Sequence, residues 1–348
     1  SAFGVYMSNI TFTADNNTYK TKVIILNNPP TLKLDRNVID ALYSRQLKEI
    51  IFISSEPKTI NRLNPENNQM KSLNLNFSPL SISISADGKK AVIGCDAKIL
   101  HVDIENMIIL NTFVIDGKIV NISYAPNDFA YALDDKWGWV NLKEVNLKTG
   151  AFSVNQQIIY TGSVGRLHPN GKWLYVADNY VSPADVRKFS LSNNGASTYL
   201  YDSPYHGDYI IGGGVWFTEK GEKMLTGEVF LSCSESESQD LRYAGSINLP
   251  VINQYKSRIW TAEYSTKNNI FYVSLNYSFH EQKFSDGIYA YNSDSHELVA
   301  TYTIDPFLDQ NNNSVPAQPR FLFKSDKTLY ILAKSQKEEI WVIQKIVI

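Results

Sequence analysis

The chain has 348 residues, of which 43% are hydrophobic and 20% charged, with 33 basic side chains against 35 acidic ones. A formal net charge of −2 leaves no basic excess for a phosphate backbone, so the composition predicts no nucleic-acid partner. The sequence also has no run of 18 apolar residues, and we therefore expect no transmembrane segment. The 21 Tyr and 16 Phe residues favour β-structure in an ordered globular protein.

The first 37 residues precede the first repeat and contain two strand-like runs, at residues 4–13 and 19–26. The chain ends in another such run, residues 340–348, which we expect to be the third strand of a four-stranded unit. A ring that lacked one strand would expose an unpaired edge. We therefore expect residues 1–37 to close the ring, with residues 19–26 as the closing strand.

Between these ends, a polar turn followed by a short apolar or aromatic strand recurs at intervals of roughly 40 to 60 residues. Residues 85–90 precede the strand at 91–93, and residues 168–172 precede the strand at 173–176. Asp-Gly and Asn-Gly in these turns tolerate the positive φ angles that a tight hairpin requires. The turns lie near residues 46, 87, 127, 170, 220, 268 and 326.

Each interval has room for a hairpin and two further strands, which together make one blade of a β-propeller. We therefore predict an all-β chain that forms a single β-propeller domain over residues 1–348. The prediction is seven four-stranded blades, with eight as the alternative, and a ring closed by an N-terminal strand. The predicted blades start near residues 38, 80, 119, 162, 212, 259 and 318.

Residues 168–178 read His-Pro-Asn-Gly-Lys-Trp-Leu-Tyr-Val-Ala-Asp, and this segment resembles the YVTN-type propeller repeat. The resemblance extends along the whole chain as a period. That family forms seven-bladed propellers in surface-layer and secreted or periplasmic proteins, and its relatives include lactonase-like enzymes. The resemblance implies an extracytoplasmic location (periplasmic, secreted or cell surface). It is also compatible with a chain that is one part of a larger surface protein or complex.

The predicted units differ mainly in two kinds of connection, which emerge on the same face of a propeller. Long connections of the first kind, between second and third strands, are expected at residues 178–186, 228–242 and 276–287. Long connections of the second kind, between blades, are expected at residues 203–213 and 305–318. Because binding residues often lie on loops held by a rigid scaffold, we expect the working surface on this face. Neutral variation of exposed loops is the alternative.

Residues 205–209 read Tyr-His-Gly-Asp-Tyr, a concentration of rings and polar groups that we expect at the mouth of the central channel. We predict that Tyr205, His206 and Asp208 contact a ligand by stacking and hydrogen bonding. The alternative is that the tyrosines pack on adjacent blades. Trp137, in a Trp-Gly-Trp sequence, has two similar interpretations, stacking on a sugar or capping a blade.

The innermost strands should line the channel, and five of their residues are candidates for ligand binding. They are Arg166, Trp216, Trp260, Glu263 and Arg320. A buried Arg or Glu needs a partner, so mutual pairing around the axis is the expected arrangement. A funnel for an anionic or sugar ligand is the alternative.

The sequence contains no HExxH or His-x-His pair and no Gly-x-Ser-x-Gly motif, so we predict no catalytic residue, metal site or cofactor. Residues 309–313 offer oxygen ligands at alternate positions, as a calcium loop does, but lack the closing Glu and the required Gly. We predict a non-enzymatic binding propeller for a protein or glycan. The alternative is a lactonase-like or other hydrolytic enzyme that uses His206, Glu263, Arg166 or Arg320 in the channel.

Overall fold

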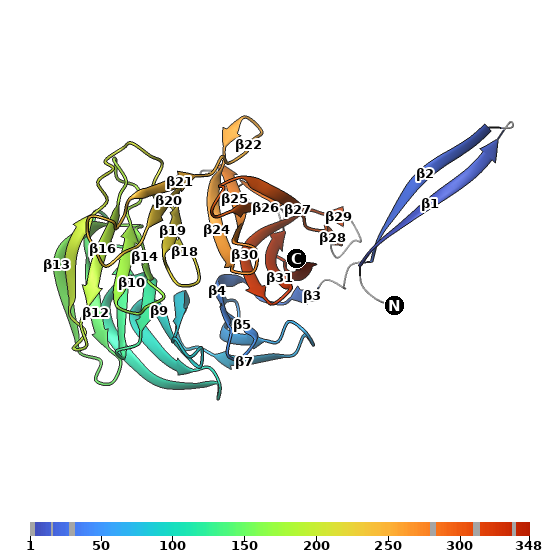
Figure 1. Ribbon diagram of the computed structural model, residues 1–348. Helices are drawn as coiled ribbons and strands as arrows, with labels where there is room; N and C mark the ends of the chain where they lie inside the picture. Colours follow the sequence, from blue (N-terminus) through green and yellow to red (C-terminus); the bar gives the residue numbers. More distant parts are fainter. Residues whose placement is uncertain (1–3, 15–16, 28–31, 279–282, 309–313, 336–338) are drawn as a thin grey trace.

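The computed structural model describes residues 4–14, 17–27, 32–278, 283–308, 314–335 and 339–348, and every element within them is a β-strand. The strands form antiparallel sheets that follow one another around a ring (Figure 1). A middle strand such as β5 (Glu49–Ser55) has five consecutive buried residues because its sheet is covered on both faces by neighbours. The continuous apolar runs of the sequence are therefore strands inside a β-propeller.

Five sheets have four strands each. One contains β4 (Val38–Ser44), β5, β6 (Lys58–Leu63) and β7 (Met70–Asn74). The next contains β14 (Val164–Leu167), β15 (Trp173–Ala177), β16 (Val186–Leu191) and β17 (Ser197–Asp202). Two more contain β18 (Trp216–Phe217), β19 (Lys223–Thr226), β20 (Val229–Ser232) and β21 (Tyr243–Ser246), and β24 (Arg258–Ser265), β25 (Ile270–Ser278), β26 (Lys283–Asn292) and β27 (Leu298–Thr303). The fifth contains β30 (Ala317–Ser325), β31 (Thr328–Ser335), β32 (Trp341–Val347) and β3 (Leu32–Leu34).

The ring closes through β3, which pairs with β32 so that Leu32 lies opposite Ile343 and Leu34 opposite Trp341. The prediction that an N-terminal strand completes the last sheet is therefore confirmed, but the predicted segment, residues 19–26, is wrong. Those residues lie in β2 (Asn17–Asn27), which pairs along its whole length with β1 (Gly4–Ala14). Because β2 takes β1 as its partner over its full length, the short segment nearest the first blade, β3, pairs with β32 and closes the ring instead.

The remaining large sheet has six strands, two of which are unusually long. It contains β8 (Pro79–Ile84), β9 (Lys90–Asp103), β10 (Ile108–Ala125), β11 (Phe129–Asp134), β12 (Trp139–Asn146) and β13 (Phe152–Tyr160). Within β9, Ala97 has a φ of 53°. The register of β10 against β9 shifts between Val114 and Lys118, and from Ile119 onward β10 pairs with β11. Thus β10 takes part in two successive antiparallel ladders.

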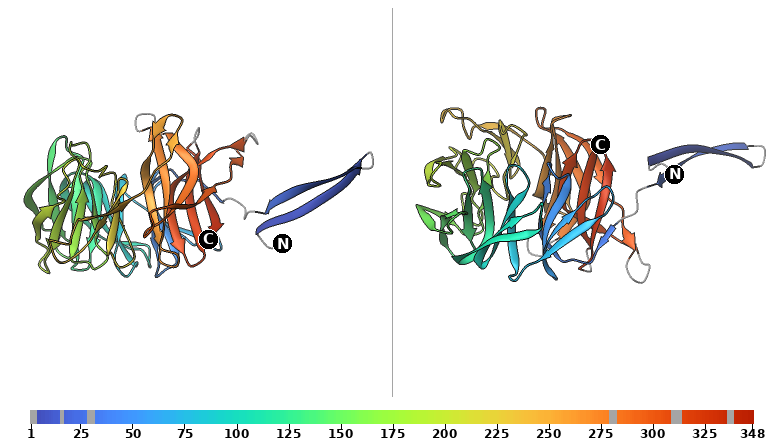
Figure 2. Two further views of the ribbon diagram at one scale, coloured as in Figure 1. Left: turned by 45° about the horizontal axis from the view of Figure 1, so that its top comes forward. Right: turned by 90° about the horizontal axis from the view of Figure 1, so that it is seen from below.

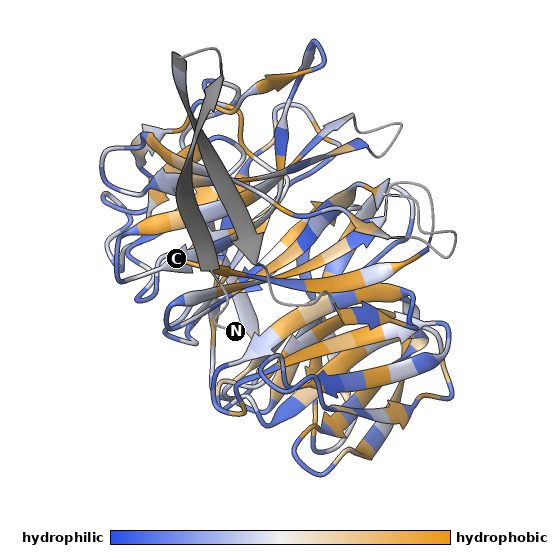
Figure 3. Ribbon diagram, turned by 90° about the vertical axis from the view of Figure 1, so that its right-hand side faces the viewer, coloured by the Kyte–Doolittle hydropathy of each residue, from blue (hydrophilic) through white to orange (hydrophobic). Residues whose placement is uncertain are grey.

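Apolar side chains fill the spaces between successive sheets, and the strands carry most of the hydrophobic colouring in Figure 3. Where the ring closes, Phe52 of β5 packs in one buried cluster with Leu332 and Trp341 of the last sheet. Each large apolar side chain that is fully buried in this way stabilises the fold by about 1.5–3 kcal/mol. Within the described residues, there is no helix of the length and apolar character needed to cross a bilayer.

The antiparallel order of the strands gives the ring two distinct faces (Figure 2). Connections between first and second and between third and fourth strands emerge on one face, which we call the hairpin-turn face. Connections between second and third strands and between sheets emerge on the other, which we call the long-loop face. The long-loop face carries residues 178–185, 203–215, 247–257 and 304–316, with residues 309–313 and the tip at 279–282 outside the described residues.

Two of these connections contain small hairpins, β22 (Val251–Ile252) with β23 (Tyr255–Lys256), and β28 (Phe307–Leu308) with β29 (Ser314–Val315). The expected second-to-third-strand loop at residues 228–242 is wrong. Gly227, with a φ of 58°, permits a tight turn directly into β20, and the long connection is residues 233–242. Because it joins a third strand to a fourth, it lies on the hairpin-turn face.

Candidate functional site

The long-loop face exposes large aromatic side chains. Trp137, in the connection between β11 and β12, is 88% exposed, and Trp139 at the start of β12 is 50% exposed. The Trp139 ring packs edge-on against Tyr160, with ring centroids 5.2 Å apart. Gly138 between the two indoles has a φ of 91°, a conformation that glycine adopts at little cost. Tyr180, Tyr255 and Trp260 add further exposed rings to this face.

The tyrosines of the segment at 205–209 lie at the outer rim of the ring, which corrects their expected place at the channel mouth. Tyr209 stacks on Tyr243 with ring centroids 4.4 Å apart, and Tyr205 packs edge-on against Tyr209 at 4.9 Å. The backbone N–H of Tyr243 donates a hydrogen bond of 2.9 Å to the Tyr205 hydroxyl. Since Tyr243 belongs to the outer strand β21, these rings pack on the adjacent sheet. A ligand contact by Tyr205 stays a prediction.

His206 and Asp208, from the same segment, are exposed. His206 Nδ1 lies 2.9 Å from Asp185 Oδ2, and the other carboxylate oxygen of Asp185 accepts hydrogen bonds from the Ser203 hydroxyl and the Val186 N–H. Burial raises the pKa of Asp185, and these hydrogen bonds oppose the effect.

Asp185, Asp202 and His206 offer ligand atoms that lie within 4.8 Å of one another. Oxygen and imidazole ligands in this arrangement suit a divalent transition metal such as zinc. The hydrogen bonds to Asp185 also explain its position by themselves, so the cluster is compatible with a metal but does not require one.

Asp40 and Arg166 lie deep in the molecule near the axis of the ring. Arg166 nevertheless keeps exposed side-chain surface, as expected of a residue that lines a water-accessible channel. The Asp40 carboxylate accepts hydrogen bonds from the N–H groups of Ala41 at 2.8 Å and Ile82 at 3.0 Å. Burial raises the pKa of Asp40 to about 6, although both hydrogen bonds and the nearby Arg166 charge act in the opposite direction.

Glu263 also lies near the axis, but its ion-pair partner is Arg45, whose NH2 atom is 3.7 Å from Glu263 Oε1. Glu263 Oε1 also accepts a hydrogen bond of 3.2 Å from the Lys324 N–H. Burial raises the pKa of Glu263, and the charges of Arg45 and Arg166 oppose that rise. Sequence reasoning named Glu263 and Arg166 but missed Arg45, because a turn residue was not expected to reach the axis.

Arg320 stacks on aromatic rings. Its Cζ atom lies 3.1 Å from the centre of the Phe284 ring and 5.5 Å from that of Trp260. Burial lowers the pKa of Arg320 to about 10. Trp216 is buried in the core between two sheets rather than in the channel lining, where we expected it, because its indole fills the space beside Ile259.

A pocket of about 520 Å³ opens on the hairpin-turn face. Its lining comes mainly from turns of four different sheets and consists of Arg45, Glu219, Tyr264, Ser265, Thr266, Lys267, Lys324, Asp326 and Lys327. Arg45, after β4, reaches Glu219, after β18, with a separation of 3.5 Å. Sequence reasoning treated these short turns as structural and missed the pocket, although the lysines that recur in them were visible.

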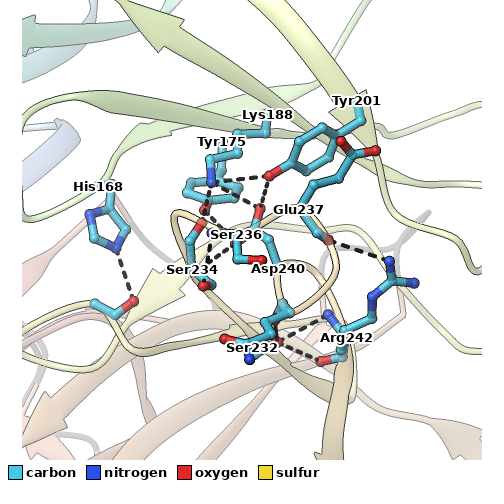
Figure 4. A network of polar contacts seen from close by, with 12 residues as sticks. His168, Tyr175, Lys188, Tyr201, Ser232, Ser234, Ser236, Glu237, Asp240 and Arg242 are labelled. Carbon is cyan, nitrogen blue, oxygen red and sulfur yellow. Dashed lines mark hydrogen bonds and ion pairs between the residues drawn. The ribbon is translucent and has the colours of Figure 1, made fainter.

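The connection at residues 233–242 is held to the β14–β17 sheet by a buried ion pair (Figure 4). Lys188 Nζ, on β16, lies 3.0 Å from Asp240 Oδ2, and the two side chains are 1% and 0% exposed. The ammonium also donates a hydrogen bond of 2.6 Å to the Ser234 carbonyl and lies 3.7 Å from the centre of the Trp173 ring. Lys188 is therefore closely surrounded by favourable partners.

Asp240 is equally well bonded (Figure 4). Its carboxylate accepts hydrogen bonds from the hydroxyls of Tyr175 at 2.9 Å and Tyr201 at 3.1 Å, and from the Ser234 N–H at 2.5 Å. A carboxylate with this many donors has no open position for a substrate. We interpret the ion pair of Lys188 and Asp240 and its hydrogen bonds as structural contacts that hold residues 233–242 in place.

No protein-family model matches this chain, and no curated protein matches its sequence. Among solved structures, it is similar to the Cps50 (Swd1) β-propeller domain of Myceliophteria thermophila, with a TM-score of 0.66 and 10% identity over 91% of this chain and 100% of that one. It is also similar to hydrazine synthase of Kuenenia stuttgartiensis, with a TM-score of 0.61 and 12% identity over 91% of this chain and 98% of that one. These likenesses show the fold, a β-propeller.

Proposed function

We propose that this chain is a non-enzymatic binding propeller that presents its long-loop face to a protein or glycan outside the cytoplasm. The observation that carries this proposal is the exposure of four aromatic side chains on or beside the connections of one face, namely Trp137, Trp139, Tyr180 and Tyr255. A large aromatic ring left in water gains free energy when a partner covers it, either by stacking or by burial in an interface.

The extracytoplasmic part of the proposal rests on the resemblance of residues 168–178 to the YVTN-type repeat. We also propose that the ring has seven blades. Support comes from the six-stranded sheet, in which β10 belongs to two ladders and β9 contains a residue of positive φ near its middle. Counting that sheet as two blades, with β9 supplying two strands and β10 one to each blade, and adding the five four-stranded sheets gives seven.

A hydrolytic enzyme with its site in the channel is the second candidate, and one observation favours it. Asp40 has a pKa raised to about 6 and lies near the Arg166 charge, a combination suited to proton transfer near neutral pH. Two of the residues first considered for such a site, however, are engaged elsewhere, His206 with Asp185 and Arg320 with Phe284. If Asp40→Asn abolished hydrolysis of a lactone by the purified chain, the enzyme would replace the binding module as our proposal.

The binding proposal can be tested on a glycan microarray with the wild type and two variants. Trp137→Ala removes the most exposed ring of the long-loop face. Phe152→Ala is the matched control, because Phe152 is an exposed aromatic at the opposite end of the same sheet, where β13 begins. We expect Trp137→Ala to weaken the observed binding at least about tenfold, which corresponds to about 1.4 kcal/mol, and Phe152→Ala to leave it unchanged.

Equal binding by both variants and the wild type would contradict the use of this face. A blank array for the wild type would exclude the glycan and leave the protein ligand, which cross-linking from the same position then tests.

A further inference from the structure

We propose a second binding site, unrelated to the long-loop face: the pocket on the hairpin-turn face takes a small, multiply charged oxyanion. The first reason is its charge. Its lining has four cationic side chains, Arg45, Lys267, Lys324 and Lys327, and two carboxylates, Glu219 and Asp326. The four positive and two negative charges leave a net charge of +2, within a chain whose formal net charge is −2. The pocket therefore concentrates positive charge that the rest of the molecule lacks.

The second reason is that most of this positive charge has no close counter-ion. Arg45 shares its charge with Glu219 at 3.5 Å and Glu263 at 3.7 Å. By contrast, none of the three lysines has a carboxylate oxygen within 4 Å of its Nζ atom in the described part of the chain.

The surroundings of Lys324 also disfavour its charged form. Burial lowers its pKa, and the neighbouring charges of Lys267 and Arg45 add to that effect, while those of Asp326 and Glu263 oppose it. An anion placed among the three cations would relieve their mutual repulsion, so the charge pattern favours an occupied pocket.

The third reason is size and donor geometry. A volume of about 520 Å³ lies within the range of pockets for small molecules and exceeds what a single inorganic ion fills. The Arg45 guanidinium suits two oxygens of one phosphate or carboxylate group, and the lysines can meet further charges from other directions. The ligand chemistry is therefore that of a small molecule with two or more phosphate or carboxylate groups.

Titration calorimetry on the full chain at low ionic strength tests the proposal with two probes, pyrophosphate and citrate. The double variant Lys267→Gln/Lys327→Gln removes two unpaired charges of the pocket. Lys71→Gln is the matched control, since Lys71 is an exposed lysine on the outer strand β7. We expect at least one probe to bind, its affinity to fall at least about tenfold in the double variant and to stay within about twofold in the control. We also expect it to weaken steeply with added sodium chloride.

Tighter binding of pyrophosphate would assign phosphate esters, and tighter binding of citrate would assign polycarboxylates. The proposal is overturned if neither probe binds at about 1 mM, or if the double variant, shown by circular dichroism to be folded, keeps the wild-type affinity. Neither result bears on Trp137, so the site on the long-loop face is judged separately.

Discussion

The two faces of the ring differ in what their connections expose. The long-loop face exposes uncharged aromatic side chains, of which Trp137 is the most exposed, and its connections vary in length. The hairpin-turn face presents charge, because its short turns bring Arg45, Lys267 and Lys327 from different sheets to one pocket. Tyr180 and Tyr255 lie on long connections of the long-loop face, and Trp137 lies on the short connection at residues 135–138. On the hairpin-turn face, short turns hold charged groups at positions set by the ring itself. The comparison suggests two kinds of ligand for one scaffold.

Within the hairpin-turn face a second contrast separates structure from binding. Lys188 and Asp240 are buried and bonded on every side, whereas Arg45 and its neighbours remain open to water. Both groups combine basic with acidic side chains. A charged side chain that is buried and fully paired stabilises the fold, whereas one that is exposed and only partly paired is available to a ligand.

The largest expected change in stability follows from breaking the buried ion pair between Lys188 and Asp240. Asp240→Ala leaves the Lys188 ammonium buried without its counter-ion, which should lower the free energy of unfolding by about 3–5 kcal/mol. Urea denaturation measures this loss. Asp294→Ala is the control, since its pair with Lys223 is exposed and should contribute less than about 1 kcal/mol. A loss below about 1 kcal/mol in Asp240→Ala would show that the buried pair does not hold residues 233–242 to the fold.

The next effect concerns pH. The pKa of Asp40 is about 6 in the fold against 3.8 for an unperturbed group, so the folded state holds the proton more tightly than the unfolded state. The stability that this proton contributes is complete below about pH 3.8 and is lost as the pH rises through about 6, a change of about 3 kcal/mol. Between pH 4 and pH 7, the free energy of unfolding should therefore fall less in Asp40→Asn than in the wild type. The same fall in both proteins would refute a raised pKa at Asp40.

Arg45→Gln should cost less unfolding free energy than Asp240→Ala, because the side chains of Arg45 and Glu219 are exposed to water and only Glu263 is largely buried. The same variant should weaken binding of the oxyanion probe at least about tenfold. A stability loss as large as that of Asp240→Ala would contradict the distinction between the exposed charges around Arg45 and the buried Lys188–Asp240 pair.

The smallest effect is expected at Trp137. Because its side chain is 88% exposed, Trp137→Ala should change the free energy of unfolding by no more than about 0.5 kcal/mol. Thermal or urea denaturation would measure it. A loss of about 2 kcal/mol or more would mean that the ring packs on the blade and is not held out for a partner.

The propeller was predictable because each hairpin is encoded locally. Gly88 and Gly171 sit in turns with φ angles of 66° and 72°, as their Asp-Gly and Asn-Gly sequences indicate, and the strands after them are buried. The period of those turns then predicts stacked sheets. Exposure of Trp137 agrees with its place in a loop, which the Trp-Gly-Trp sequence already marked.

Contacts between distant segments could not be predicted in the same way. The closure by β3, the reach of Arg45 to Glu263 and the burial of Trp216 all depend on which sheets become neighbours in space. A three-residue strand such as β3 carries too little pattern to be recognised alone. The raised pKa of Asp40 likewise comes from burial by several sheets and has no local signature.

Site-specific photo-cross-linking tests most directly whether the long-loop face is the recognition surface. A photoreactive phenylalanine derivative is placed at Trp137 or Tyr255 on that face, and at Phe152 or Lys71 at the other ends of their sheets, in cells that make the protein. We predict one covalently linked partner, shared by the first two positions and absent from the second two. The same partner at all four positions, or a partner at the second two alone, would contradict recognition by the long-loop face.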